Sequence, residues 1–204
     1  LVLYDGEPGA SSALNTISGK DGIFELLETA VKGQYGSYAY KIGGGDWQYI
    51  NIWDPSMTLK VELAGSPGDS VNGKTVTRDT ELAFYVEAPV VANADVGAKV
   101  QLVFTTPSGG SVTTFGTAVT DYSNDFTGIL LDDASKLVSK VKPGSNAQAG
   151  VWTVQAEYTS PEEFKNYAAK SNTITFTVQS STLTLTAAED SVIRSNPFTV
   201  TIKG

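Results

Sequence analysis

Carboxylates are the residues of this sequence whose type and spacing come closest to forming a site. Asp121 and Asp125 stand in one short polar segment, and Asp132 and Asp133 follow soon after. Ca²⁺ prefers carboxylate and carbonyl oxygens on a flexible loop, so these four residues are a candidate calcium site. Their spacing is not that of an EF-hand, and a solvated acidic loop is the alternative interpretation.

Most other kinds of catalysis lack their usual residues. The chain of 204 residues contains no histidine and no cysteine. This excludes most imidazole chemistry, thiolate zinc sites, iron–sulfur clusters and disulfides. Glu162 and Glu163 are explained as residues in the first turn of a helix, where they complement its dipole. We therefore expect no enzyme and assign no catalytic or cofactor-binding residue.

Aromatic residues offer a second candidate surface. Trp47, Tyr49 and Trp53 are close in sequence, and a row of exposed rings would stack on sugar rings. Packing in a core or a domain interface is the alternative, because strand alternation sends half of such residues inward. Trp152 is expected in a core, since it stands at the centre of a strand-like segment.

The charge balance narrows the choice of partners. Lysine and arginine number 14 against 22 acidic residues, which gives a net charge of −8 and argues against nucleic acid and anionic membrane surfaces. No apolar run approaches the roughly 18 residues that a spanning helix needs, so we predict no transmembrane segment. No basic and apolar leader opens the chain, and we interpret Leu1 as a mature or trimmed end of a secreted protein.

Alternation of apolar and polar residues predicts an all-β fold. Short strands separated by turn residues over 55–180 are typical of an immunoglobulin-like antiparallel β-sandwich. Residues 1–54 indicate a smaller N-terminal β-rich unit, in which we expect one hairpin and a helix over 22–32. Two further helices are predicted, over 161–169 with Ser160 as N-cap and over 134–141.

The last part of the sequence repeats part of the predicted sandwich. Val76 and Val192 each begin the same frame, which reads Val, any residue, Arg, three linker residues and three alternating apolar positions. A similar strand precedes each frame and contains Leu59 or Leu185. The step from this leucine to the valine is 17 residues in the first copy and 7 in the second. Residues 181–204 therefore resemble the first two strands of a further sandwich.

Two strands alone leave open edges and an uncovered apolar face. Three interpretations remain open: a tandem array with further domains, donation of these strands to a neighbouring molecule, or packing on the same chain. In donation, ladder hydrogen bonds give affinity and an apolar row fills a groove in the partner. The predicted assembly residues are Leu183, Leu185, Phe198, Val200 and Ile202.

Four segments carry a resemblance to a known family. Residues 53–61, 71–80, 149–157 and 183–202 together resemble a domain family of unassigned biochemical function from methanogenic archaea. Its members are secreted surface proteins of the surface-layer or sheath type, often followed by further β-sandwich repeats. The resemblance implies location and architecture, and it brings no catalytic residue. Residues 10–33 and 122–131 depart from the pattern.

These observations together predict a structural component of an archaeal cell envelope, in a surface layer or sheath. We expect it to be secreted, to lie at the cell surface and to have further copies of itself as partner. No cofactor is expected, apart from calcium at the acidic cluster. An extracellular carbohydrate-binding or adhesive module is the alternative, and it depends on the aromatic row.

Overall fold

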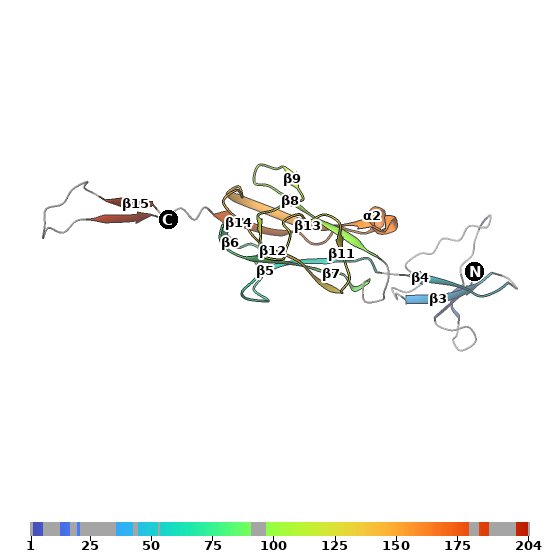
Figure 1. Cartoon of the computed structure of the whole chain (residues 1–204). Coiled ribbons are helices and arrows are strands. Elements are labelled where there is room, and N and C mark those ends of the chain that lie inside the picture. Colours follow the sequence, from blue (N-terminus) through green and yellow to red (C-terminus); the bar gives the residue numbers. More distant parts are fainter. Residues whose placement is uncertain are drawn as a thin grey trace. The chain divides into compact units, whose positions relative to one another are not determined.

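The structure is a computed structural model of the chain (Figure 1). It describes residues 2–5, 13–16, 20, 36–42, 45–52, 54–90, 97–179, 184–187 and 199–203. The chain divides into two compact units, Leu1–Asp54 and Pro55–Gly204. Strands dominate both units, as predicted for an all-β protein.

The N-terminal unit is a four-stranded antiparallel sheet with the order β2-β1-β3-β4. Its strands are β1 (Val2–Asp5), β2 (Ala13–Thr16), β3 (Gly36–Lys41) and β4 (Gln48–Ile52). Tyr38 and Ala39 of β3 are buried, whereas the edge strand β4 is exposed along most of its length. The expected hairpin is the β3–β4 pair. The helix predicted over 22–32 lies outside the described residues.

The larger unit contains a sandwich of two sheets, which the described residues before β15 (Thr184–Ala187) form. The first has the order β10-β12-β7-β5. Its strands are β5 (Thr58–Leu63), β7 (Leu82–Glu87), β10 (Thr117–Ala118) and β12 (Ser135–Lys142). The second has the order β11-β8-β13-β14-β6, and β9 also pairs with β8. Its strands are β6 (Thr75–Thr77), β8 (Lys99–Thr105), β9 (Ser111–Val112), β11 (Ile129–Leu130), β13 (Gly150–Ser160) and β14 (Ile174–Gln179).

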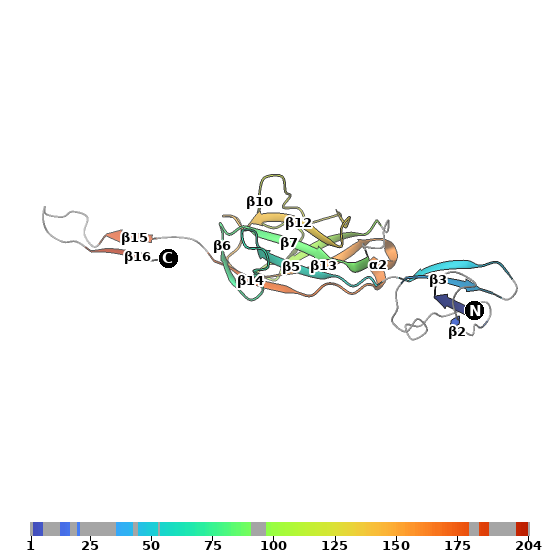
Figure 2. The same cartoon turned by 90° about the horizontal axis from the view of Figure 1, so that it is seen from below.

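The strand order is that of an immunoglobulin-like sandwich. Of the six main strands, one sheet joins the first, second and fourth as β5, β7 and β12, and the other joins the third, fifth and sixth as β8, β13 and β14. After β5 the chain crosses to the second sheet, where β6 runs parallel to β14. Figure 2 shows β12, β7 and β5 side by side. The predicted fold class is thus confirmed.

Aromatic side chains fill the space between the two sheets. The ring of Phe84 on β7 lies 5.7 Å from that of Phe104 on β8 and 5.2 Å from that of Phe126. Phe115 packs on the ring of Trp152 at 5.0 Å. Trp152 is only 6% exposed, as expected, and its indole N–H donates to the carbonyl oxygen of Gln148. Burial of this apolar area is the main stabilisation of the sandwich.

The helix predicted over 134–141 is wrong, because this segment forms strand β12. Leu137, Val138 and Val141 matched a helical spacing, but β12 pairs with β7 and its register shifts between Leu137 and Ser139. The extra residue at this irregularity breaks the two-residue alternation of a regular strand. Ser139 and Val141 are both buried beyond it.

The helix predicted over 161–169 is confirmed as the shorter α2 (Glu162–Tyr167). Its N-cap is Pro161 and not Ser160, because Ser160 is the last residue of β13. No side chain bonds the cap, whereas Glu162 and Glu163 occupy the first turn as expected. None of the described helices is long and apolar enough to cross a lipid bilayer.

Residues near the end of the chain form β15 (Thr184–Ala187) and β16 (Val200–Lys203). The two strands make an antiparallel two-stranded sheet. Within the described residues, neither of them pairs with any other strand.

Candidate functional site

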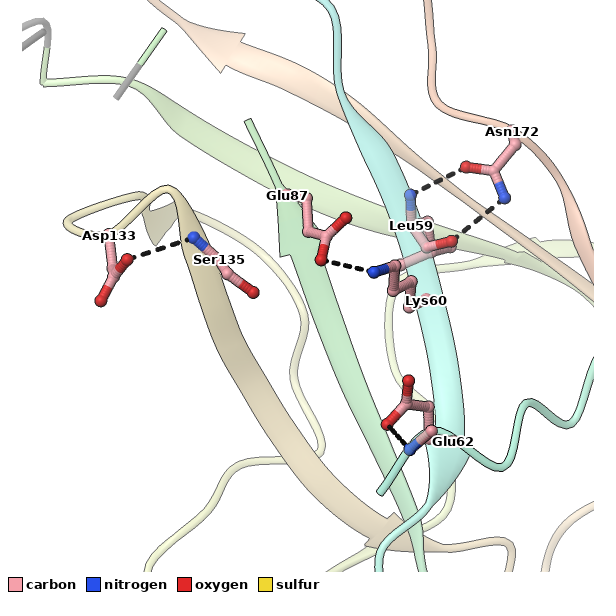
Figure 3. A network of polar contacts seen from close by, with 8 residues as sticks. Leu59, Lys60, Glu62, Glu87, Asp133, Ser135 and Asn172 are labelled. Carbon is pink, nitrogen blue, oxygen red and sulfur yellow. Dashed lines mark hydrogen bonds and ion pairs between the residues drawn. The ribbon is translucent and has the colours of Figure 1, made fainter. Parts of the chain in front are cut away.

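The outer edge of β5 is covered by a side chain from a connection between two elements of the second sheet's half of the sandwich. Asn172, in the connection between α2 and β14, accepts a hydrogen bond from the Leu59 backbone N–H at 2.9 Å. Its Nδ2 donates to the Leu59 carbonyl oxygen at 3.0 Å, as Figure 3 shows. The amide therefore makes both bonds that another strand would make at Leu59.

The rest of this edge is covered by the connection that follows β5. The backbone N–H of Val71 donates to the carbonyl oxygen of Val61 at 2.9 Å, and that of Leu63 donates to Asp69 at 3.1 Å. On the same strand, Lys60 Nζ lies 2.5 Å from Glu87 Oε1 (Figure 3), and this bond raises the pKa of Lys60. Covered and charged edges discourage the addition of further strands.

The β15–β16 pair has the same register as β5–β7. Leu59 pairs with Val86 in the sandwich, and Leu185 pairs with Ile202 near the end of the chain. In the frame of the sequence repeat, Leu185 stands for Leu59 and Ile202 stands for Val86. The predicted repeat is thus reproduced in the strand pairing.

The predicted assembly residues lie only partly within this pair. Leu185, Val200 and Ile202 belong to β15 and β16, and Val200 is 41% exposed. Leu183 and Phe198 lie outside the described residues, as does Arg194, the counterpart of Arg78. Arg78 donates from Nη2 to the carbonyl oxygen of Ala147 at 3.0 Å, which is a scaffold contact.

Three of the four candidate calcium ligands, Asp125, Asp132 and Asp133, engage in separate local contacts. Asp125 accepts bonds from the backbone N–H and the hydroxyl of Thr127. Asp133 accepts a bond from the Ser135 backbone N–H at 3.2 Å (Figure 3). Among the described residues, no three acidic side chains gather closely enough to hold a metal ion.

The other two candidate residues are Asp132 and Asp121. Asp132 pairs with Lys136 at 2.6 Å, and this bond lowers the pKa of Asp132. Asp121 adopts a φ of 70°, a turn conformation that aspartate tolerates better than most residues. Calcium binding by these four residues therefore stays a prediction.

The aromatic row is divided between different environments. Tyr49 on β4 is 66% exposed. Trp47 is half-buried, and Lys41 Nζ lies 5.6 Å from the centre of its ring. Trp53 lies outside the described residues. An exposed ring is thus present at Tyr49, while Trp47 already has a cation on its face.

One polar cluster was not found from the sequence. Glu157 on β13 accepts a bond from Gln101 Nε2 at 2.6 Å and pairs with Lys170 at 2.6 Å. The Lys170 bond is the main cause that lowers the pKa of Glu157. The three residues line a hollow of about 280 Å³ beside α2. The sequence could have indicated this cluster only through the pairing of β8 with β13, which places Glu157 opposite Gln101.

Comparisons with protein families and with curated proteins find no match for this chain.

Proposed function

We propose that this chain is a non-catalytic structural module of an archaeal cell envelope, in a surface layer or sheath. It assembles with further copies of itself through contacts between β-sandwiches and through donated strands. The observation that carries this proposal is the β15–β16 pair, which repeats the register of β5–β7 without a third strand in the described residues. A strand pair of this kind stabilises itself by joining another sheet.

The sandwich suits a mechanical role. Its sheets are held by backbone hydrogen-bond ladders, and its aromatic core is almost fully buried. Local opening is costly where contacts and buried area are dense, so such a unit resists force and proteolysis. The net charge of −8 keeps separate copies soluble. Divalent cations would then bridge facing carboxylates of neighbouring copies.

Secretion and the cell surface as location rest on the family resemblance. The acidic balance and the absence of cysteine are compatible with them, since a chain of this length folds without disulfides.

Electron microscopy of the purified chain tests the proposal. We expect ordered sheets, tubes or filaments at high protein concentration, and more of them when Ca²⁺ is added. The matched control is the same preparation with a chelator in place of Ca²⁺. Particles that stay monomeric under both conditions would overturn the proposal.

A carbohydrate-binding module is the second candidate, and the exposure of Tyr49 favours it. Polysaccharides that bind over this ring would change the protein's fluorescence, and Tyr49→Ala would remove the change. Tyr122→Ala is the control, because that ring lies on the larger unit under Lys140. An emission spectrum unaffected by polysaccharides would exclude this candidate.

A further inference from the structure

The two rows of backbone groups on β7 have different partners. The carbonyl oxygen of Glu81, just before β7, accepts a bond from Ala64 on the β5 side. The N–H of Ala88, just after β7, donates to Ala134 on the β12 side. Backbone groups alternate along an antiparallel strand, so Phe84 and Val86 present theirs to β12.

We expect the same geometry on β16, because the two strand pairs share both the sequence frame and the register. Val200 occupies the position of Phe84, because it pairs with Ala187 as Phe84 pairs with Val61. Ile202 occupies the position of Val86 in the same way. On this expectation, Val200 and Ile202 present their N–H and C=O groups to the edge of β16 that faces away from β15. In the sandwich, the equivalent edge of β7 is the one that takes a third strand, β12.

We propose that this edge of β16 pairs with the same edge of a second copy of the chain. The two β16 strands run antiparallel about a two-fold axis at Thr201, and the strand order becomes β15-β16-β16-β15. Val200 of one copy then exchanges hydrogen bonds with Ile202 of the other, twice. This inference rests on the proposed assembly function and names the edge and the symmetry by which it operates.

The residues of β16 suit pairing with a copy of themselves. Lys203 is the one charged residue in the two strands, which otherwise contain Thr, Leu, Ala, Val and Ile. The two-fold register places Lys203 opposite Thr199 of the second copy, so the like charges stand at opposite ends. Like charges directly opposite each other would be destabilising.

The apolar positions reinforce the same arrangement. The ladder pairs Leu185 with Ile202 and Ala187 with Val200, so the apolar residues of both strands stand opposite one another. Four strands double this row, and a sheet of three or more strands with an apolar face is stable where a hairpin is marginal. The corresponding edge strand of the sandwich, β5, is covered by Asn172 at Leu59 and is therefore a poor alternative partner for β16.

A single cysteine tests the two-fold axis directly, because the chain has no cysteine of its own. In the proposed pairing, Thr201 stands opposite Thr201 of the second copy as a non-hydrogen-bonded pair. The two Cα atoms would lie about 4.5 Å apart, within the range of about 4.4–6.8 Å that a disulfide requires. Thr201 is exposed and tolerates the change. Full-length Thr201→Cys should form a disulfide-linked dimer under mild oxidation.

Thr186→Cys is the matched control. Thr186 pairs with Thr201 of the same hairpin, so it stands on the strand away from the axis. Three strand spacings separate it from its copy, roughly 14 Å, which is too far for a disulfide. Val200→Pro provides a second variant, because it removes an N–H that faces the second copy and spares the ladder to β15. It should convert the dimer seen by light scattering to monomer, with an unchanged unfolding midpoint of the sandwich.

The outcomes separate this inference from the proposed function. A disulfide in Thr186→Cys and none in Thr201→Cys would overturn it in favour of the β15 edge. Monomers with neither disulfide would overturn both the inference and the proposed function. Ordered assemblies with neither disulfide would overturn the inference alone. A Thr201→Cys dimer without ordered assemblies would support the inference and overturn the proposed function.

Discussion

The strand pairs β5–β7 and β15–β16 share a register but differ in their surroundings. Phe84 on β7 is fully buried, and Val200, its counterpart on β16, is 41% exposed. β7 has β12 on the side away from β5, whereas the described residues place no strand on the side of β16 away from β15. The comparison teaches that the sequence frame sets the pairing of two strands, while burial depends on the sheet that they join.

The outer strands of the two pairs differ in a related way. The β5 edge is closed by the Asn172 amide and by residues 69–71 of the connection that follows. In the second copy of the frame, the step to the valine is 7 residues in place of 17. The residues that supply the cover in the first copy thus have no counterpart of the same length in the second.

The largest expected effect is the difference in stability between truncating Phe84 on β7 and truncating Val200, its counterpart on β16. Phe84→Ala removes a ring that contacts Phe104 and Phe126, and we expect a loss of about 3–5 kcal/mol in the free energy of unfolding. Val200→Ala, at the same frame position, should change it by less than about 0.5 kcal/mol. Urea unfolding of the full chain measures both values. Equal losses in the two variants would show that β15–β16 is buried like β5–β7.

The next effect concerns the cover of the β5 edge. Asn172→Ala removes both bonds to Leu59, and we expect a loss of about 1 kcal/mol in the free energy of unfolding. An opened edge should also promote association that grows with protein concentration. Both changes are measured by urea unfolding and by light scattering.

Asn172→Asp is the control for this experiment. Its carboxylate keeps an acceptor for the Leu59 N–H and loses the donor to the Leu59 carbonyl oxygen. An intermediate stability is therefore expected. If both variants behave like the parent chain, Asn172 does not protect the edge.

The strands with regular alternation could be predicted from the sequence. On β13, Trp152, Val154, Ala156 and Tyr158 form one row, and all four are buried. The failure at β12 has a physical cause, since the register shift between Leu137 and Ser139 replaces the two-residue period with an irregular one. A bulge is set by the neighbouring strand, which a local pattern does not contain.

The candidate site was less predictable because it depends on long-range contacts. Asn172 and Leu59 are 113 residues apart, and a single asparagine in a connection carries no signal of its role. The acidic residues show the opposite case. They are close in sequence, yet Asp125 accepts a bond from Thr127 and Asp132 pairs with Lys136, so each has its own local partner. Proximity in sequence alone therefore did not show which partner each of these carboxylates has in the fold.

The smallest expected effect on stability concerns the contacts that hold residues 170–172, the segment that carries Asn172, against β13. Ser171, next to Asn172, is buried; its hydroxyl accepts a bond from the Ala156 N–H at 2.8 Å, and its own N–H donates to the Ala156 carbonyl oxygen. Lys170 adds an ion pair with Glu157 at 2.6 Å, which is partly exposed to solvent. We therefore expect Ser171 to be the main anchor and the ion pair to be a minor one.

The pH dependence of stability isolates this minor anchor. The Lys170 bond lowers the folded-state pKa of Glu157 below its ordinary value of 4.5. The contribution of Glu157 is therefore complete above pH 4.5 and is lost as the pH falls through the lower folded-state pKa. Glu157→Gln should lower the unfolding midpoint slightly at pH 7, and the difference from the parent chain should shrink under acidic conditions. A difference between Glu157→Gln and the parent chain that stays constant from pH 7 into the acidic range would mean that the carboxylate's charge does not anchor the segment, and that Ser171 alone positions Asn172 against the β5 edge.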